Sequence, residues 1–257
     1  MKSIQPADIE LSYIMPVFFN QKNTNVLTNL LEDYSKIAPA VLKRIQFVIV
    51  DDCSPIPVTV PSHININYQI YRIISDIRWN QGGARNLGVV KAISPKIILT
   101  DCDHFFPEKL LSQILDSKIP QHTLYKFKRV DANGNQQQSP CNIFYTSKMT
   151  FFSSLGYDEE FCGNYGYEDV MFRHFQHAMG NKIKYFTRFK KIISNTIDRE
   201  NSYHSLVRDT TTNLALMEAK LPLLKNKNPF QAHSRLFLNF EYQKVAENWI
   251  QHKHEKQ

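Results

Sequence analysis

One short stretch, residues 96–107, constrains the fold of this chain more than any other. The apolar run Ile97–Leu99 continues almost directly into Asp101-Cys102-Asp103. Such a run is typical of a strand buried on both faces of an α/β sheet, and ligands in open α/β sheets bind beyond the carboxyl ends of the strands. Two carboxylates there are poor packing material but suit a hard divalent cation that bridges phosphates. Because an isolated Asp-x-Asp also occurs in solvated turns, the rest of the chain must decide between these interpretations.

The size of the chain and its cysteines limit the class of protein. A length of 257 residues is enough for one large α/β domain or two small ones. The four cysteines show no metal-ligand spacing, so we interpret them as free thiols of a reducing cytoplasm. No apolar run approaches the roughly 18 residues that span a bilayer, and we therefore expect a cytoplasmic protein.

Basic residues give the chain a net charge of +7 and concentrate in its second half. A solvated basic face is the simplest interpretation, and an anionic membrane surface or a phosphate-bearing substrate is the alternative. No arginine-glycine run or RNA-binding aromatic motif accompanies the charge, so we expect no nucleic-acid partner. The basic residues in question are Lys182, Lys184, Arg188, Lys190, Lys191, Lys220, Lys225 and Lys227.

The first half of the chain alternates between strand and helix patterns. Strands are predicted over 9–19, 45–50 and 64–74, a helix over 26–37, and a glycine-bearing loop at 79–88 that begins a second helix. This repeated order predicts crossover connections and a largely parallel sheet.

The second half is predicted to add strands over 124–130, 142–146 and 183–193 and a helix that begins at Glu168. From about Leu206 the pattern is predominantly helical. We find no repeat or convincing linker, so we expect one domain in which residues 1–205 form the core and residues 206–257 a helical C-terminal extension.

Four acidic or glycine-bearing features follow an apolar run or begin a helix. Strand ends and helix starts in such a sheet meet at one edge, so we expect these features to converge on one crevice. Amides at the start of the helix containing Gly83 could bind a phosphate, and Arg85 could add a charge-assisted contact. Asp103 could bind a metal, and Glu168 or Asp169 could take a proton from an acceptor. The four features are Asp51-Asp52, Gly82–Gly88, Asp101-Cys102-Asp103 and Glu168-Asp169.

With these features in this order, the chain resembles glycosyltransferases of the GT-A fold. The resemblance is nearest to the large family 2 group and to galactosyltransferase-like enzymes, and it extends from about residue 11 to residue 205. It implies an α/β fold with a Rossmann-like mixed central sheet flanked by helices. The motifs that carry it are Pro16-Val17-Phe18-Phe19-Asn20, Val50-Asp51-Asp52-Cys53-Ser54, Asn80-Gln81-Gly82-Gly83-Ala84-Arg85-Asn86-Leu87-Gly88, Asp101-Cys102-Asp103, Gly156-Tyr157-Asp158-Glu159 and Gly166-Tyr167-Glu168-Asp169.

The resemblance implies a site for a UDP-sugar donor. The acid that matches Asp51 or Asp52 grips the nucleobase, commonly uracil, and the residue that matches Arg85 lies near the diphosphate. Cys53 stands where the usual loop has a glycine. The implied donor-binding set is Pro16, Val17, Phe18, Asp51, Asp52, Asn80, Gly83, Arg85, Asp101 and Cys102.

The resemblance also implies a metal and a catalytic pair. Asp103 and His204 match ligands of Mn²⁺ or Mg²⁺, Glu168 matches a residue that orients the acceptor, and Asp169 matches the general base. A structural role is the alternative for three residues that we singled out. Phe18 could be a core aromatic, Arg85 part of a structural ion pair, and His204 a solvated side chain.

The sequence therefore predicts a metal-dependent inverting glycosyltransferase that moves a sugar from a UDP-sugar to a glycan hydroxyl. Family habit points to bacterial surface polysaccharide synthesis, and the basic late segment could dock a lipid-linked glycan, polysaccharide assembly proteins or the inner face of the membrane. Two alternatives stay open. A sugar nucleotidyltransferase would normally carry a glycine-rich basic signature near the N-terminus, which is absent here. A non-catalytic nucleotide- or glycan-binding module would not need both a metal acid and a base.

Overall fold

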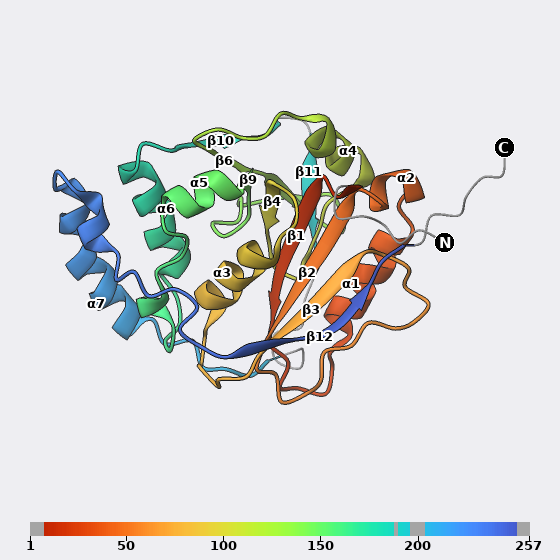
Figure 1. Cartoon of the computed structure of the whole chain (residues 1–257), viewed down its shortest axis with the longest axis horizontal. Helices are drawn as coiled ribbons and strands as arrows, with labels where there is room; N and C mark the ends of the chain where they lie inside the picture. Colours follow the sequence, from red (N-terminus) through yellow and green to blue (C-terminus); the bar gives the residue numbers. More distant parts are fainter. Residues whose placement is uncertain (1–7, 188–189, 196–203, 251–257) are drawn as a thin grey trace.

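The computed structural model describes residues 8–187, 190–195 and 204–250 (Figure 1). Arg188 of the basic segment and residues 251–257 of the predicted extension lie outside these ranges. The centre of the molecule is a large mixed sheet. Its strands are β1 (Leu11–Val17), β2 (Ile45–Asp52), β3 (Tyr68–Ile73), β4 (Lys96–Leu99), β6 (Thr123–Lys126), β9 (Phe144–Ser147), β10 (Lys182–Tyr185) and β12 (Tyr242–Asn248).

The described strands of this sheet follow the order β10-β6-β9-β4-β1-β2-β3-β12. β1, β2, β3 and β4 run parallel, as the alternation of strand and helix patterns predicts. β9 and β12 run antiparallel to their neighbours, which makes the sheet mixed. Since β9 reverses direction between β4 and β6, both β6 and β10 point the same way as β4.

The central strands are buried along their whole length, which explains their continuous apolar runs. β1 contains a proline although it lies between two other strands. Its pairing with β4 covers only Ser12–Ile14, so Pro16 lies past the end of β4. Proline lacks an amide hydrogen, and it is tolerated here because β4 offers no partner at this position.

Helices cover both faces of the sheet, and one apolar core lies between the sheet and the helices on each face. One face carries α1, α2 and α4, whose leucines pack with Tyr13 and Phe47. The other carries α3, α5 and α6, which pack on Ile14 and Val50. The six helices are α1 (Asn25–Ser35), α2 (Pro39–Leu42), α3 (Gln81–Lys91), α4 (Glu108–Asp116), α5 (Lys148–Ser153) and α6 (Glu168–Ala178).

A small second sheet contains the later parts of two predicted strands. Its described strands follow the order β5-β11-β7-β8. They are β5 (His104–Phe105), β7 (Lys128–Asp131), β8 (Gln136–Gln137) and β11 (Lys191–Ser194). The predicted strand 124–130 divides into β6 and β7, because Phe127 between them turns into the core against Phe106. The predicted strand 183–193 divides in the same way into β10 and β11. The amide of Asn195 donates to the carbonyl of Asp103, so this sheet fixes the backbone of the Asp-x-Asp turn.

The C-terminal segment corrects the prediction of a helical extension. It contains α7 (Thr211–Lys220) and two short 3-10 helices, η3 (Leu221–Lys225) and η4 (Pro229–Ala232), but it then returns to the large sheet as β12 beside β3. Figure 1 shows α7 at the left end of the molecule and β12 along the sheet edge. β12 is an edge strand that exposes most of its side chains, so it lacks the apolar alternation by which strands are recognised.

We call residues 233–241, which connect η4 to β12, the strap. The strap carries two left-handed residues, Arg235 and Leu238. It is held down by Asp158 and Glu159 at the start of another 3-10 helix, η2 (Glu159–Phe161). No helix among the described residues is long and apolar enough to cross a membrane.

Candidate functional site

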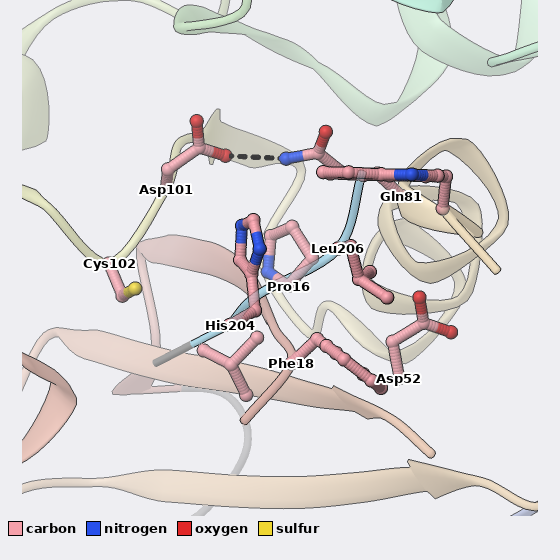
Figure 2. A pocket seen from close by; sticks show the side chains of 10 residues that line it. Pro16, Phe18, Asp52, Gln81, Asp101, Cys102, His204 and Leu206 are labelled. Atoms are coloured by element: carbon pink, nitrogen blue, oxygen red, sulfur yellow. Dashed lines mark hydrogen bonds between the residues drawn. The ribbon is translucent and has the colours of Figure 1, made fainter. Parts of the chain in front are cut away.

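A crevice of about 80 Å³ opens where β1, β2 and β4 end. Its floor comes from the residues that follow these strands, and its wall comes from the start of α3 and from the segment after residue 203. Figure 2 shows Asp52 and Asp101 on opposite sides of His204 in this view. The crevice is lined by Pro16, Val17, Phe18, Asp52, Trp79, Gln81, Asp101, Cys102, His204 and Leu206.

Much of the predicted donor-binding set meets in this crevice. Phe18 lines it and is half-buried, so it is not simply a core aromatic. The predicted residues that the structure brings together here are Pro16, Val17, Phe18, Asp52, Asp101, Cys102 and, from the metal set, His204. The predicted residues outside the crevice lining are Asp51, Asn80, Gly83, Arg85, Asp103, Glu168 and Asp169.

Two adjacent acids at the end of β2 have different environments. Asp51 is already engaged, since its Oδ2 lies 2.6 Å from Nη1 of Arg72 and its Oδ1 accepts a hydrogen bond from the amide of Ser54. Side chains of consecutive strand residues point to opposite faces, and Asp52 lines the crevice. Among the described residues its Oδ1 is buried without a hydrogen-bond partner. Burial, with the charges of Asp51 and Asp76, raises the pKa of Asp52 to about 8.

The turn after β2 shows how this chain accommodates the departure at Cys53. Cys53 has a φ of 57°, in the left-handed region where glycine carries no steric cost. The cysteine therefore adopts the backbone conformation that the usual glycine would adopt, and the turn is retained.

Arg85 joins the two acidic motifs beside the crevice. Its side chain is 0% exposed, Nη2 donates to Oδ1 of Asp101 at 2.8 Å, and Nη1 donates to Oδ1 of Asp169 at 2.9 Å. Asp101 also accepts hydrogen bonds from Gln81 and Asn142. The ion pair that was the structural alternative for Arg85 is thus real, and its partners are the predicted site residues themselves.

Asp169 is held in one orientation by two donors on the same oxygen. Its Oδ1 accepts from Arg85 and from the hydroxyl of Tyr157, both at 2.9 Å. Tyr157 is itself fixed by stacking on Phe172 with ring centroids 4.2 Å apart. The neighbouring Glu168 is mostly buried beside Asp169, and burial followed by that negative charge raises its pKa to about 8.

The start of α3 gives two predicted residues a packing role. An added Cβ on Gly83 would lie 2.7 Å from Cε1 of Phe240 in the strap and closer still to the side chain of Asn80. Only glycine fits between them. Asn80 precedes α3 and is buried. A phosphate contact of the α3 amides stays a prediction.

The predicted metal ligands fit one mode of binding. Among the described residues, no group of three or more His, Cys, Asp or Glu side chains could hold a metal ion. Asp103 does supply one carboxylate next to the crevice, and its Oδ1 lies 2.5 Å from Nδ1 of His104. His204 lines the crevice and packs edge-on against Trp79. This donor set fits a cation bound by one or two protein groups together with substrate phosphates, and not a cage made by the protein alone.

Sequence reasoning missed several residues that shape the site. Trp79 is the first residue of the predicted glycine-bearing loop at 79–88, where an aromatic just before a helix is a visible signal, and its Nε1 donates to the carbonyl of Val207. Tyr157 belongs to a motif that was recognised without a role. No sequence motif marks Arg72 or Leu206, because each reaches the site through contacts with residues that are distant in the sequence.

A family model described as glycosyl transferase family 2 matches residues 12–200 of the chain. No curated protein matches this chain. Similar solved structures include residues 1–349 of Staphylococcus aureus TarS in complex with UDP-GlcNAc, at 15% identity and a TM-score of 0.59, with 87% of this chain and 69% of that chain covered. Against a longer TarS chain the match covers 41% of that chain.

Two further structures are similar across most of the chain. The catalytic domain of Drosophila beta1,4galactosyltransferase 7, in complex with xylobiose, has 12% identity and a TM-score of 0.50, covering 86% of this chain and 81% of that one. The mannosyltransferase PcManGT from Pyrobaculum calidifontis, in complex with GDP-Man and Mn²⁺, has 13% identity and a TM-score of 0.51, covering 86% and 66%. These likenesses confirm the predicted fold, a mixed central sheet flanked by helices.

Proposed function

This chain belongs to glycosyl transferase family 2, and from that premise we propose that it is a metal-dependent inverting enzyme that moves a sugar from a UDP-sugar to a glycan hydroxyl. The observation that carries the proposal is the Arg85 node. It places Asp101, at the end of a central strand and in the crevice, beside Asp169, at the start of α6. Donor-binding and proton-accepting groups are thus adjacent.

The crevice is the proposed site of the nucleobase. A uracil ring presents an N–H between two carbonyl groups, so its partner must both accept and donate. With a pKa of about 8, the carboxyl of Asp52 keeps its proton at neutral pH and can do both. Phe18 and Trp79 supply apolar walls for a flat ring. The S. aureus TarS complexes with UDP-GlcNAc and UDP support this choice of nucleotide.

The proposed chemistry is a single displacement in which Asp169 is the general base. Oδ1 of Asp169 is occupied by Arg85 and Tyr157, which leaves Oδ2 as the oxygen that takes the acceptor proton. The acceptor oxygen forms a bond to the anomeric carbon as the bond from that carbon to the diphosphate oxygen breaks, and UDP leaves. Glu168, beside the base, is placed to hold the acceptor.

Mn²⁺ or Mg²⁺, held by Asp103 and His204 together with the diphosphate, would offset the negative charge that develops on the leaving group. Arg85 positions the carboxylate of Asp101 at the edge of the crevice, because its Nη2 donates a hydrogen bond to Oδ1 of Asp101. PcManGT, whose fold this chain shares, is in complex with Mn²⁺, and this supports the choice of a divalent metal.

The acceptor that we propose is a glycan or a lipid-linked glycan of a bacterial surface polysaccharide, elongated on the cytoplasmic side of the membrane. The sequence resemblance and the likeness to a staphylococcal protein crystallised with UDP-GlcNAc support this setting. Lys182 and Lys184, the exposed lysines of β10, would face the acceptor, membrane lipid or assembly proteins.

A panel of nucleotide sugars tests the proposal. Purified protein would be incubated with UDP-glucose, UDP-galactose, UDP-GlcNAc and GDP-mannose in Mn²⁺, and release of the free nucleoside diphosphate would be followed. We expect slow release of UDP from at least one UDP-sugar and its loss in EDTA. Release of GDP alone would overturn the choice of nucleotide. Binding without any turnover would favour the non-catalytic module, and sugar nucleotide formation from UTP and a sugar phosphate would favour the nucleotidyltransferase.

A further inference from the structure

A second and much larger groove, of about 570 Å³, lies between α6 and β10. It is distinct from the crevice, with which it shares no lining residue. Five of its side chains are cationic or can become so, and none of those that line it is a carboxylate. The lining residues are Arg173, His174, His177, Gly180, Asn181, Lys182, Ile183 and Lys184.

The lining of the groove begins one helical turn from the proposed base. Asp169, Arg173 and His177 stand four residues apart on α6 and therefore share one side of that helix. With a rise of 1.5 Å per residue, Arg173 and His177 lie about 6 Å and about 12 Å along the helix from Asp169. α6 starts at the crevice edge of the sheet, and β10 starts at the opposite edge beside the end of α6 (Figure 1). A chain-like ligand with one hydroxyl at Asp169 can therefore extend into the groove.

The charges in the groove have room for a ligand. Lys182 and Lys184 are exposed and, being two residues apart on β10, point to the same side. No acidic partner lies among the groove residues. Nε of Arg173 is buried and has no hydrogen-bond partner in the described part of the chain.

A purely structural explanation accounts for only part of this charge. Cations near the last turn of a helix complement its dipole, typically by about 0.3–1 kcal/mol each. That explains His177 in the last turn of α6. It does not explain Arg173 in the second turn or the two lysines of β10, which point into the same groove from another element.

We propose that this groove binds phosphate groups carried by the acceptor, about 6–12 Å from the attacked hydroxyl along α6. This inference rests on the proposed function and deepens it, because it names the chemical class of the acceptor. Phosphate suits the groove better than a neutral glycan does, since arginine and lysine form their strongest hydrogen bonds with phosphate oxygens.

The test uses the 257-residue chain and a fluorescently labelled linear polyphosphate, with affinity followed by anisotropy at low salt. The variant Lys182→Glu/Lys184→Glu reverses two groove charges. Lys225→Glu/Lys227→Glu is the matched control, because these lysines are also exposed and two residues apart but lie near η3. We expect the groove variant to bind polyphosphate about tenfold more weakly or worse, which corresponds to one lost charge-assisted bond, and the control to stay near wild type. Lys182→Gln/Lys184→Gln should show a smaller loss in the same direction.

Each result decides the question. Equal effects of the groove and control variants, or no saturable binding to wild type, would overturn the groove as a phosphate site. Equally tight binding of polygalacturonate would replace phosphate by carboxylate as the ligand class. Binding to phosphatidylglycerol vesicles without binding to free polyphosphate would assign the groove to the membrane surface. UDP binding, measured on the same preparations, should be unchanged in both variants, and its absence from wild type would count against the proposed function and not against the groove.

Discussion

The buried acid at the crevice, Asp52, and the buried acids beneath the strap differ in whether their carboxylate oxygens have hydrogen-bond partners. Asp158 accepts hydrogen bonds from Nζ of Lys220 and from Ser234, and Glu159 accepts from the amides of Leu238 and Asn239 and from Asn86. Asp52 in the crevice has a buried oxygen without a partner among the described residues.

The pKa values separate the two groups in the same way. Burial raises the pKa of Asp158, but His233, Lys220 and Ser234 overcome this effect and hold it below its ordinary range. Burial raises the pKa of Asp52 and of Glu168 to about 8, and their partners do not compensate. Buried polar groups are normally satisfied, and strongly raised values cluster at functional sites. The comparison indicates that the strap acids stabilise the fold, whereas the fold alone does not compensate the burial of Asp52 and Glu168.

The largest effect is expected from Asp169→Asn, which removes the basicity of the carboxylate and keeps its shape. Transfer, or hydrolytic release of UDP, should fall by the roughly 10²–10⁴-fold typical of a general base. UDP affinity in Mn²⁺ should stay near wild type. Asp158→Asn is the matched change beneath the strap and should leave turnover by the folded protein close to wild type. Near-normal turnover by Asp169→Asn would move the base elsewhere, first to Glu168.

Lys220→Met should produce the largest loss of stability. Nζ of Lys220 lies 2.7 Å from Asp158 and 2.6 Å from Glu160, and the lysine is 7% exposed. Breaking a buried ion pair leaves an uncompensated carboxylate and typically costs about 3–5 kcal/mol. Urea unfolding would measure this against Lys225→Met, whose lysine is exposed and should be nearly neutral. Equal effects of the two variants would mean that the ion pairs of Lys220 with Asp158 and Glu160 contribute nothing to stability.

The two kinds of acid should also respond to pH with opposite signs. The pKa of Asp52 rises from 3.8 to about 8 on folding, so its protonated form is favoured in the folded state. Its contribution is complete below pH 4 and is lost as the pH rises through about 8. The stability of Asp52→Asn relative to wild type should therefore increase between these values.

For Asp158, whose pKa is lowered, the contribution is present above pH 4 and is lost as the pH falls. The deficit of Asp158→Asn should therefore be greatest near neutrality and shrink in acid. Free energies of unfolding at about pH 2.5, 4, 6 and 8 would test both signs, since the Asp158 contribution is lost below pH 4 and the Asp52 contribution between pH 4 and 8. Parallel profiles for the two variants would contradict the distinction between the acids.

The smallest effect is expected from His204→Gln. Imidazole suits Mn²⁺ less well than carboxylate does, so this variant should weaken metal-dependent UDP binding less than Asp103→Ala does. Calorimetry with UDP and Mn²⁺ would compare them. A structure with UDP and metal that places His204 away from the ion would exclude it as a ligand.

The sequence predicted those parts of the molecule that depend on local pattern. The apolar runs of β1, β2 and β4 are buried as expected, and because parallel strands end at one edge, the acids that follow them meet at one crevice. The helix that begins at Glu168 and the position of Arg85 follow from the same logic.

The rest depends on contacts between distant segments. β12 is an exposed edge strand, and its place beside β3 is fixed by backbone pairing, which leaves no apolar period. The difference between Asp51 and Asp52 depends on Arg72, which pairs with Asp51 and lies 21 residues after it in the sequence. Asp158 and Glu159 belong to a motif that carries the family resemblance without an assigned role, and only their contacts with the strap reveal a structural one.

Calorimetric titration of UDP, with and without Mn²⁺, tests the central claim most directly. On the proposed function, Asp103 would hold a metal together with the diphosphate of UDP, so wild-type protein should bind UDP in Mn²⁺ and much more weakly in EDTA, and Asp103→Ala should lose this difference while remaining folded. Equal UDP affinity in Mn²⁺ and in EDTA, unchanged by Asp103→Ala, would contradict the account.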